Sequence, residues 1–392
     1  MNQILVDDIE LSHFKCMDHV KIPLEFGVNV IVGRNGEGKS TILNSIAYAL
    51  TGYDMFGAKL DPFNRSGDPC AWVLLNGEAD RTPLTLRRIA QKKGKKTENI
   101  VSGDISLDKE VFLSLSNPRY ILQLDPKGIK SVLASILKMD ADDMVDLIPA
   151  AKKTVSDVFD GTDSVTYINS VEKAIKDNTA LVKKTEDSIL IHKGKISGTE
   201  NINEIFAENG IVPNEEIAEA IAMTASAARS MIDVLEIEVE KQKLRGKNLN
   251  AYRSACYEVI AKKFNDSLTH VNIELEKDGK DVFIVKYDGK DVRACSNSEQ
   301  LRAGLEIVDT LSAISGLSYP CMVDNAECAL NVDTTKYPNI KQFIFTIVAD
   351  EELSTWDGED LREIHSGVVM PRTAEDLQPS VKILDGWGTK SA

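Results

Sequence analysis

The sequence lacks three patterns that would each point to a particular class of protein. No run approaches the ~18 apolar residues of a membrane span, so we expect no membrane helix. None of the six cysteines forms a CxxC pair, so neither a zinc hook nor a disulfide framework is indicated. The first residues carry acids where a signal peptide carries bases. We therefore expect a cytoplasmic protein with free thiols.

Positive charge is also in deficit, because 46 lysines and arginines face 61 acidic residues, for a net charge of −15. Surfaces that bind DNA non-specifically are usually basic, so any DNA contact here must be local. The best local candidate is the stretch QKKGKK at residues 91–96, beyond an alternating segment at 71–88 that predicts two paired strands. Two interpretations stay open for this stretch: a solvated turn, or a DNA contact through Lys92, Lys93, Lys95 and Lys96.

One motif is complete, the pattern GxxxxGKS at residues 33–40. It follows a short β-branched run at residues 28–32 and precedes ILNSIAYAL, whose apolar residues suit a buried helix. Glycines let backbone N–H groups converge on phosphate, and the helix start adds its positive dipole end. We expect Lys39 to bridge the outer phosphates of ATP and Ser40 to ligate Mg²⁺. The predicted nucleotide-binding residues are Asn35, Gly36, Glu37, Gly38, Lys39, Ser40 and Thr41.

A second acidic strand end lies far along the chain. Residues 319–323, YPCMV, form a short apolar segment that ends in Asp324, which suits a water-mediated contact to Mg²⁺. Most of the chain separates Asp324 from the glycine loop, far more than a compact P-loop domain needs. The sequence therefore predicts an insertion between two halves of one site.

The inserted segment has the spacing of a helical hairpin. A heptad-like seam spaced 3-4-3-4-3-4 occupies residues 165–195. Its members are Ile168, Val171, Ile175, Asn178, Val182, Thr185 and Ile189. A break is expected at residues 194–213, and Asn214 then suits a helix start. The second seam contains Ile217, Ile221, Thr224, Ala228, Met231 and Leu235.

These seams predict two antiparallel helices of about 28 residues, projecting about 40 Å. A plain helical subdomain packed on its own head is the alternative. After the helices, VNIELEKDGKDVFIVKYDGKDVRAC predicts a three-stranded meander with DGK turns.

The stretch IELSHFKC at residues 9–16, followed by GVNVIVGRNGEGKSTILNSIAYALTG, resembles the opening of the SMC/RecF/SbcC group of ABC-type P-loop ATPases. The likeness is close over residues 1–55, weaker over 290–353 and only architectural between. It implies an α/β fold: a split ATPase head with a mixed sheet flanked by helices, an antiparallel meander and an inserted antiparallel helical hairpin arm.

The same resemblance implies four parts. Residues 1–160 form the N-terminal half of the head with the glycine loop, and residues 161–268 form the hairpin arm. Residues 269–354 form the C-terminal half of the head, and residues 355–392 form a tail without clear periodicity.

Three further residues take roles from the resemblance. Lys15 falls where the group often has a basic residue that reaches the phosphates. Gln123 is a candidate for the glutamine that senses Mg²⁺ and water, with a solvated loop amide as the alternative. Ser296 opens the segment SNSEQLR, which resembles the signature region that contacts the ATP of a partner subunit, and a helix-like run follows it.

The sequence departs from the pattern of the group at three places. Asn297 and Ser298 replace two signature glycines, Asn325 replaces the glutamate directly after Asp324, and Ala349 stands at the expected histidine. Each departure affects hydrolysis or the dimer interface. ATP binding is therefore better supported than turnover.

Two residues are candidates to act on the attacking water. Asn325 can orient a water molecule but cannot accept its proton. Glu327 is acidic and follows a strand end, where the chain usually turns, so our hypothesis is that Glu327 activates the water. The alternative is a helix-start or surface carboxylate in a slow or inactive ATPase.

The resemblance implies that ATP and Mg²⁺ drive homodimerisation through the heads and that ATP is hydrolysed to ADP and phosphate. It also implies action in DNA repair, recombination or replication, with DNA and a separate nuclease or recombination protein as partners and no membrane association. A different class stays open, a nucleotide-gated structural or loader module that dimerises with little or no hydrolysis. A transporter ATPase fits less well, because transporter subunits seldom carry helical arms.

Overall fold

The structure is a computed structural model. It describes residues 2–63, 68–94, 96–103, 105, 107–136, 164–276, 282–326, 332–348, 380–385 and 388–391. The chain divides into two compact units: the head, formed by residues 1–138 and 260–392, and the arm, formed by residues 139–259. The four-part division expected from the sequence stays a prediction.

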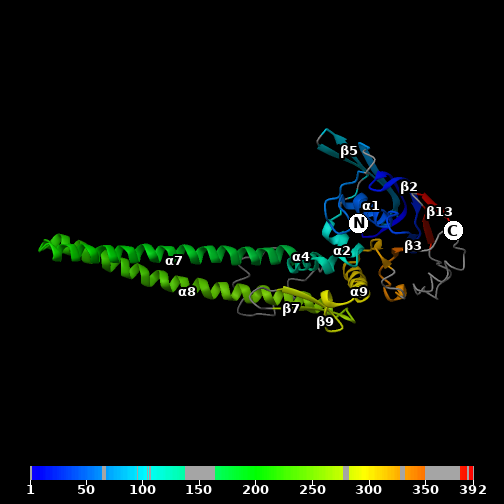
Figure 1. Ribbon diagram of the computed structural model, residues 1–392. Helices are drawn as coiled ribbons and strands as arrows, with labels where there is room; N and C mark the ends of the chain where they lie inside the picture. Colours follow the sequence, from blue (N-terminus) through cyan, green and yellow to red (C-terminus); the bar gives the residue numbers. More distant parts are fainter. Residues whose placement is uncertain are drawn as a thin grey trace. The chain divides into compact units, whose positions relative to one another are not determined.

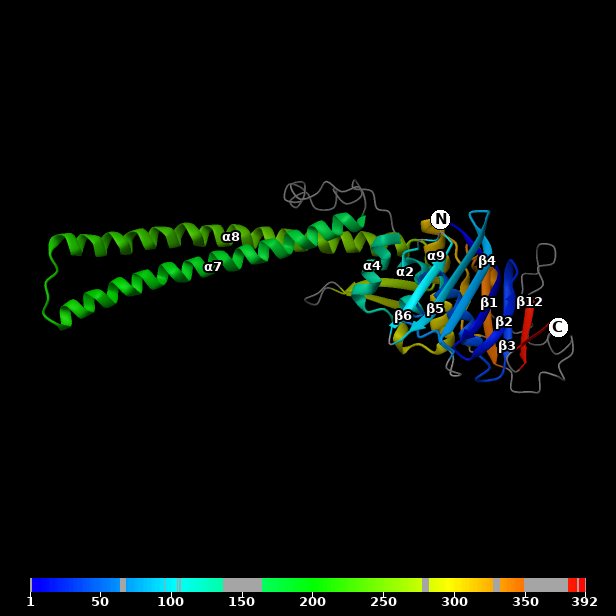
Figure 2. The same ribbon diagram turned by 90° about the horizontal axis from the view of Figure 1, so that it is seen from above.

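The head contains a five-stranded sheet with the order β10-β11-β3-β12-β13. Its strands are β3 (Gly27–Gly33), β10 (Cys321–Val323), β11 (Gln342–Val348), β12 (Ser380–Asp385) and β13 (Gly388–Ser391). The pairs β10–β11, β11–β3 and β3–β12 are parallel, and β12–β13 is antiparallel. Strands β3 and β11 are almost continuous apolar runs, as expected for parallel strands buried on both faces. Segments from the two ends of the chain therefore build one sheet (Figure 2).

A second sheet of the head is antiparallel, with the order β2-β1-β4-β5-β6. Its strands are β1 (Ile4–Phe14), β2 (Met17–Pro23), β4 (Cys70–Ala79), β5 (Thr82–Lys93) and β6 (Lys96–Ser102). The strand pair expected at residues 71–88 is present as β4 and β5. The described residues of the basic stretch lie at the end of β5, at Gly94 and at the start of β6. Strand β6 was not predicted because all its residues are exposed and show no alternation.

Gln342 joins the two sheets. Its buried side-chain amide donates to the carbonyls of Val6 (2.7 Å) and Glu25 (3.0 Å), while its Oε1 accepts from the Val6 N–H at 2.9 Å. These contacts fall where the β1–β4 register shifts between Val6 and Asp8. The irregular backbone of β1 thus finds its partners on β11.

Within the described ranges, five helices belong wholly to the head: α1 (Lys39–Thr51), α2 (Lys109–Ser116), α3 (Tyr120–Gln123), α4 (Pro126–Ile136) and α9 (Asn297–Ser315). Helix α1 contacts strands of both sheets (Figure 1). Helix α9 packs Leu301, Leu305 and Val308 against the apolar side chains of β3, β10 and β11.

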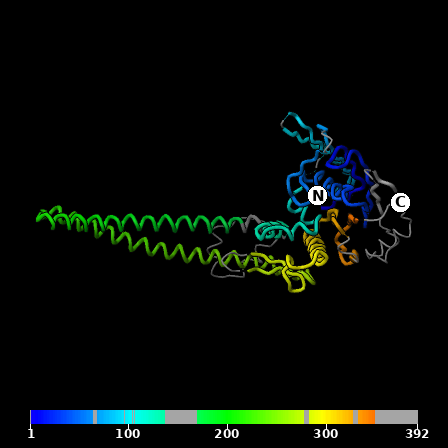
Figure 3. The backbone as a smooth tube through the Cα atoms, viewed as in Figure 1, coloured from blue at the N-terminus to red at the C-terminus, as the bar shows by residue number. Residues whose placement is uncertain are grey.

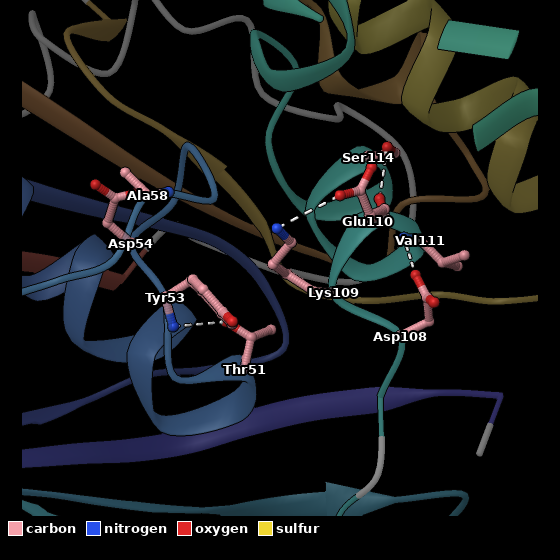
Figure 4. Close-up of polar contacts among 9 residues, drawn as sticks. All are labelled: Thr51, Tyr53, Asp54, Ala58, Asp108, Lys109, Glu110, Val111 and Ser114. Atoms are coloured by element: carbon pink, nitrogen blue, oxygen red, sulfur yellow. Dashed lines mark hydrogen bonds and ion pairs between the residues drawn. The ribbon is translucent and has the colours of Figure 1, made fainter. Parts of the chain in front are cut away.

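Helix α2 begins at a cap that Figure 4 shows in detail. The Asp108 side chain accepts from the Val111 N–H at 2.9 Å, and the Lys109 ammonium lies 4.7 Å from the centre of the Tyr53 ring. The loop after α1 closes on itself because Asp54 accepts from the N–H groups of Phe56 and Ala58. These contacts fix the chain between α1 and α2 locally.

The predicted meander is present as a three-stranded antiparallel sheet of the head. It consists of β7 (Val271–Glu276), β8 (Val282–Tyr287) and β9 (Lys290–Asp291), in that order. A short 3-10 turn at Val292–Ala294 connects it to α9, and another lies at Thr334–Lys336.

The described part of the arm consists of α7 (Ser164–Glu208) and most of α8 (Glu215–Asn265), which lie side by side as an antiparallel pair (Figure 3). At 45 and 51 residues they are about 68 and 77 Å long, so the predicted projection of 40 Å was wrong. The break between the helices falls at residues 209–214, within the expected range, but it begins later than expected because Gly194 and Gly198 lie within α7. Each glycine costs a helix only about 1 kcal/mol. The turn comes at Gly210, whose φ of 64° is left-handed.

The α7 seam is confirmed from Val171 on: Val171, Asn178, Thr185 and Ile189 are buried, Ile175 and Val182 are half-buried, and the side chain of Ile168 lies outside the described part. The α8 seam was partly wrong. Ala228 is buried, but Ile217 and Met231 are 44% and 45% exposed. Over residues 215–249 of α8, the buried positions are Ala228, Ile232, Val239, Gln242 and Leu249. The run AIAMTASAAR at residues 220–229 holds many small residues, so its apolar stripe was ambiguous.

No helix in the described ranges is both long enough and apolar enough to cross a membrane.

Candidate functional site

The glycine loop lies between the end of β3 at Gly33 and the start of α1 at Lys39. Gly38 has a φ of 91°, and a Cβ placed there would lie 2.3 Å from the Met17 Cε and 2.9 Å from the Cys16 Sγ. Gly36 is also left-handed, with a φ of 87°. The loop therefore follows a path that side chains at these positions would obstruct or strain.

Lys39 is 6% exposed and curls back over its own loop. Its Nζ donates to the carbonyls of Gly33 (2.9 Å) and Arg34 (2.8 Å). Glu37 closes the loop from the other side, because its Oε2 accepts from the Arg34 N–H at 2.6 Å. Asn35 and Gly36 are exposed at the loop surface. An ammonium thus lies at a helix N-terminus, an arrangement suited to phosphate.

Ser40 and Asp324 meet directly. The Ser40 hydroxyl donates to Asp324 Oδ2 at 2.7 Å, although 284 positions separate the two residues in the chain. Asp324 follows β10 directly, and β10, β11 and β3 are neighbouring parallel strands, so their carboxyl ends lie at the same edge of the sheet. The structure therefore brings together the two halves of the site that the sequence separated.

Thr346 belongs to the same cluster, and the sequence analysis missed it. Its buried hydroxyl donates to Asp324 Oδ1 at 2.6 Å and accepts from the Asn325 N–H at 3.1 Å. Both carboxylate oxygens of Asp324 are therefore hydrogen-bonded, one from α1 and one from β11. One local signal existed: Thr346 is the single hydroxyl within the apolar run FIFTIV.

The oxygen donors at this edge fit Mg²⁺. A hydroxyl and a carboxylate are the hard ligands that this ion takes, and Mg²⁺ is usually held by one or two protein groups plus water and substrate phosphates. Among the residues that the structure describes, no group of three or more His, Cys, Asp or Glu side chains could hold a metal ion. The Ser40–Asp324 pair therefore suits a metal shared with a nucleotide rather than a closed protein cage.

Lys15 lies in the tight turn between β1 and β2, beside the glycine loop. Its φ is 53°, and its N–H donates to the Pro62 carbonyl at 2.8 Å. The next residue, Cys16, has its Sγ 3.2 Å from the Thr41 Oγ1 on α1. This turn therefore packs on the start of α1, and a phosphate contact through Lys15 stays a prediction.

The candidates for water activation are only partly described. Asn325 is exposed and has a left-handed φ of 54°, a conformation that asparagine tolerates better than most residues. Glu327 and Ala349 lie outside the described residues. The roles of Asn325 and Glu327 therefore stay predictions.

Ser296 stands immediately before α9, as the sequence predicted. Its side chain accepts from the Glu299 N–H at 3.3 Å, and Glu299 Oε2 accepts from the Ser296 N–H at 2.8 Å, which forms a capping box. The hydrogen bond from the Ser296 backbone N–H holds the pKa of Glu299 below its ordinary value. Asn297 and Ser298 fit this helical start without glycine.

Gln123 ends α3 and is exposed, and its side chain makes no hydrogen bond to another described residue. The preceding segment packs on α9, where a Cβ at Gly304 would lie 2.0 Å from the Pro118 carbonyl oxygen. The structure thus does not join Gln123 to the Ser40–Asp324 pair by a hydrogen bond. Its assignment as a magnesium sensor stays a prediction.

Lysines of the β5–β6 turn have neighbours within the head. The Lys92 ammonium lies 4.3 Å from the centre of the Phe63 ring, and Lys93 pairs with Glu98 at 2.5 Å. Lys96 is exposed, and Lys95 lies outside the described residues. Because Lys92 and Lys93 already have these neighbours, their ammonium groups are less available for contacts with DNA phosphates than the sequence suggests.

The family model described as "AAA domain" matches residues 8–303. Among curated proteins, the DNA double-strand break repair Rad50 ATPase of Thermoplasma acidophilum is 24% identical over 201 residues, covering 45% of this chain and 22% of that protein. The DNA replication and repair protein RecF of Clostridium tetani is 27% identical over 104 residues, covering 26% of this chain and 28% of that protein. The chain spans about a quarter of the length of these relatives.

Solved structures also resemble the chain at low sequence identity. The SMC head domain of Pyrococcus furiosus, with an extended coiled coil and bound to the C-terminal domain of ScpA, is 14% identical. The comparison covers 100% of this chain and 96% of that one, with a TM-score of 0.44. The recombination mediator protein RecF with ATP is also 14% identical, with 99% and 98% coverage and a TM-score of 0.43.

Proposed function

The chain belongs to the AAA domain family, in the SMC/RecF/SbcC-like group of P-loop ATPases, and on that premise we propose that it is an ATP-dependent protein of DNA repair or recombination. The observation that carries this proposal is the 2.7 Å hydrogen bond from Ser40 to Asp324. It joins the helix start after the glycine loop to the strand end at residue 324. This junction of two distant segments suits nucleotide binding better than a vestigial loop.

Binding begins at the glycine loop. The start of α1, directly after the glycine loop, would attract the phosphates of ATP through its N–H groups and its dipole. Lys39 is already held at the centre of the loop by the Gly33 and Arg34 carbonyls, and its ammonium would exchange these partners for the outer phosphate oxygens. Because the side chain is pre-positioned, little side-chain entropy is lost on binding.

Ser40 and Asp324 would hold the magnesium ion, which supplies charge neutralisation at the phosphates when it is bound. The Ser40 hydroxyl donates its hydrogen bond to Asp324 Oδ2, so the lone pairs of its oxygen can face a cation. Asp324 in turn keeps the Ser40 rotamer fixed. These residues need little rearrangement to accept the ion.

Hydrolysis needs a group that accepts a proton from the attacking water. Asn325 cannot accept this proton, because its side chain is a neutral amide and not a carboxylate. We assign proton acceptance to Glu327, two residues farther on, and the orientation of the water to Asn325. The left-handed backbone at Asn325 turns the chain just after the metal-binding carboxylate, which supports this assignment.

Head dimerisation would use the start of α9. Ser296 is exposed at the N-terminus of a 19-residue helix, so its hydroxyl and the first N–H groups can meet the γ-phosphate bound by a second copy. DNA and a separate nuclease or recombination protein are the partners that this function implies. The turn with Lys92, Lys93, Lys95 and Lys96 is the proposed DNA contact.

A second function is a nucleotide-gated structural or loader module. The observation that favours it is Asn325 at the position directly after the metal-binding aspartate, where a proton acceptor is expected. Such a module binds ATP and dimerises but scarcely hydrolyses it. A DNA-stimulated ATPase rate supports the first function, and ATP-dependent dimerisation without turnover supports the second.

The proposed site is tested by titrating a fluorescent ATP analogue with magnesium present. We expect Lys39→Ala to weaken binding about ten- to a hundredfold, because a charged hydrogen bond contributes about 1.5–3 kcal/mol. Lys183→Ala, an exposed lysine of the arm, is the matched control and should bind like the wild type. Equal affinities of all three proteins would contradict the proposed site.

The proposed base is tested by the steady-state ATPase rate of Glu327→Gln with Asn325→Ala beside it. Loss of turnover in Glu327→Gln with nucleotide affinity retained supports the assignment. An unchanged rate removes Glu327 as the proton acceptor.

A further inference from the structure

Thr346 lies beside the Ser40–Asp324 pair, and the proposed function assigns it no role. It lies on β11, the strand between β10 and β3, and Val323 of β10 is paired with Phe345. Asp324 follows Val323 and Thr346 follows Phe345, so this pairing places the threonine beside the carboxylate. Thr346 is fully buried, with 0% exposure.

Side-chain alternation places Thr346 away from the large apolar core of the sheet. Phe343, Phe345 and Ile347 of the same strand belong to the cluster that α9 covers. Thr346 is on the other face, where α1 and its Ser40 also lie, since Ser40 and Thr346 bond the same carboxylate. A valine would fill this position equally well, so packing alone does not require a hydroxyl.

The hydrogen bonds of Thr346 have only one consistent direction. An ionised carboxylate can only accept and a backbone N–H can only donate. The threonine proton therefore points to Asp324 Oδ1 at 2.6 Å, and a lone pair receives the Asn325 N–H at 3.1 Å. One hydroxyl thus fixes both the carboxylate and the next peptide unit.

Fixing both groups has a consequence for the site. With Oδ1 tied to β11 and Oδ2 tied to α1, the plane of the Asp324 carboxylate cannot rotate freely. The Asn325 N–H bond also holds the left-handed turn, with its φ of 54°, through which the chain leaves β10. Thr346 therefore controls where the carboxylate points and how the segment after it departs.

We propose that Thr346 is a positioning residue for the magnesium-binding carboxylate: its hydroxyl holds Asp324 in the orientation that presents Oδ2 to the ion beside Ser40. The proposal rests on the proposed nucleotide site. Thr346 is buried and its hydroxyl bonds Asp324, so it would act on the ion through that carboxylate. Outer partners of this kind commonly set metal affinity, and their loss costs about ten- to a hundredfold.

The experiment measures the affinity of the full chain for a fluorescent ATP analogue, once with magnesium chloride and once with EDTA. The ratio of the two affinities is the magnesium dependence. Thr346→Val and Thr346→Ala remove the hydroxyl, Thr346→Ser keeps it, and Asp324→Asn serves as the reference for a damaged metal site. Thermal unfolding in EDTA shows whether each variant is folded.

We expect the magnesium dependence to fall about ten- to a hundredfold in Thr346→Val and Thr346→Ala, and to stay near that of the wild type in Thr346→Ser. Affinity in EDTA should be the same in all folded variants. The inference is overturned if the hydroxyl-less variants keep the full magnesium dependence, or if Thr346→Ser loses as much as they do. If the wild type itself gains nothing from magnesium, the proposed function fails and takes this inference with it.

Discussion

Buried polar side chains occur in both units, and they are connected differently in the head and in the arm. In the head, Ser40, Asp324 and Thr346 come from three elements, and both oxygens of Asp324 have a donor. In the arm, Asn178 and Gln242 face each other between two helices, and the Asn178 Oδ1 has no partner. The head network is complete and defines a site, whereas the arm network leaves a group unsatisfied.

The arm network nevertheless links α7 and α8 at one defined level. The Asn178 Nδ2 donates to the Gln242 carbonyl at 2.9 Å, and the Thr185 hydroxyl lies 3.3 Å from the Gln242 Oε1. All three side chains are at most 8% exposed. A polar pair in a helical seam lowers stability but fixes the alignment of the helices. Buried polar side chains therefore build the candidate site in the head, whereas in the arm they align two helices.

Glycines show the same contrast in packing. In α9 of the head, a Cβ at Gly304 would lie 2.0 Å from the Pro118 carbonyl oxygen, a backbone atom that cannot move aside cheaply. In α7 of the arm, a Cβ at Gly198 would meet nothing within 4 Å. Helix α9 is interlocked with the segment before α3, while this face of α7 is open.

The largest expected effect comes from breaking that interlock. Gly304→Ala should lower the free energy of unfolding of the head by about 3 kcal/mol, because overpacking forces backbone to shift. Gly198→Ala is the matched control and should raise the stability of the arm by about 0.5–1 kcal/mol through helix propensity. Urea denaturation followed by circular dichroism measures both. Effects of equal sign would contradict the packing contrast.

A smaller effect is expected from the polar pair of the arm. Asn178→Leu should raise the free energy of unfolding by about 1 kcal/mol, because it removes a buried oxygen without a partner. Thr179→Leu, at the exposed neighbouring position, controls for helix propensity. Thermal unfolding is the measurement. A destabilised Asn178→Leu would show that the bond to Gln242 outweighs the unsatisfied oxygen.

The smallest effect concerns the helix caps and depends on pH. Hydrogen bonds from Ser296 lower the pKa of Glu299 from its ordinary 4.5, so this carboxylate stabilises the head above pH 4.5 and less as pH falls through the folded pKa. Glu299→Ala should therefore destabilise the head at neutral pH, with the difference closing in acid. The arm is capped by neutral Asn214, which accepts from the Ile217 N–H at 2.9 Å.

Asn214→Ala should cost about 1 kcal/mol with little change over the same pH range. Unfolding curves at pH 7 and at pH 3 distinguish the two caps. If both variants respond to pH alike, the charge on Glu299 does not account for the stability of the α9 cap.

Half of the site could be predicted because its residues lie in continuous sequence motifs. Lys39 and Ser40 belong to an unbroken motif between a strand and a helix, and Asp324 ends an apolar run. Thr346 was missed because its role depends on β11 lying beside β10 in one register, which no local pattern encodes. The roles of Lys15 and Gln123 came from resemblance, those of Asn325 and Glu327 came from side-chain chemistry after a strand end, and all four stay predictions.

The arm shows the same limit. The seam of α7 was predicted because branched apolar residues recur at regular spacing, and Val171 and Ile189 are buried as expected. The α8 seam runs through small residues that give little contrast, and its register was misplaced. The helix length was underestimated, because Gly194 and Gly198 suggested a break that the long α7 overrides.

The most direct test of a shared phosphate-and-magnesium pocket is a crystal structure with a non-hydrolysable ATP analogue and Mn²⁺ in place of Mg²⁺. The anomalous signal of manganese locates the ion independently of the protein. We predict one ion at the β-phosphate side of the nucleotide, with the Ser40 hydroxyl as a ligand and Asp324 beside it. Manganese bound elsewhere, or a nucleotide bound away from Lys39 and Ser40, would contradict the account.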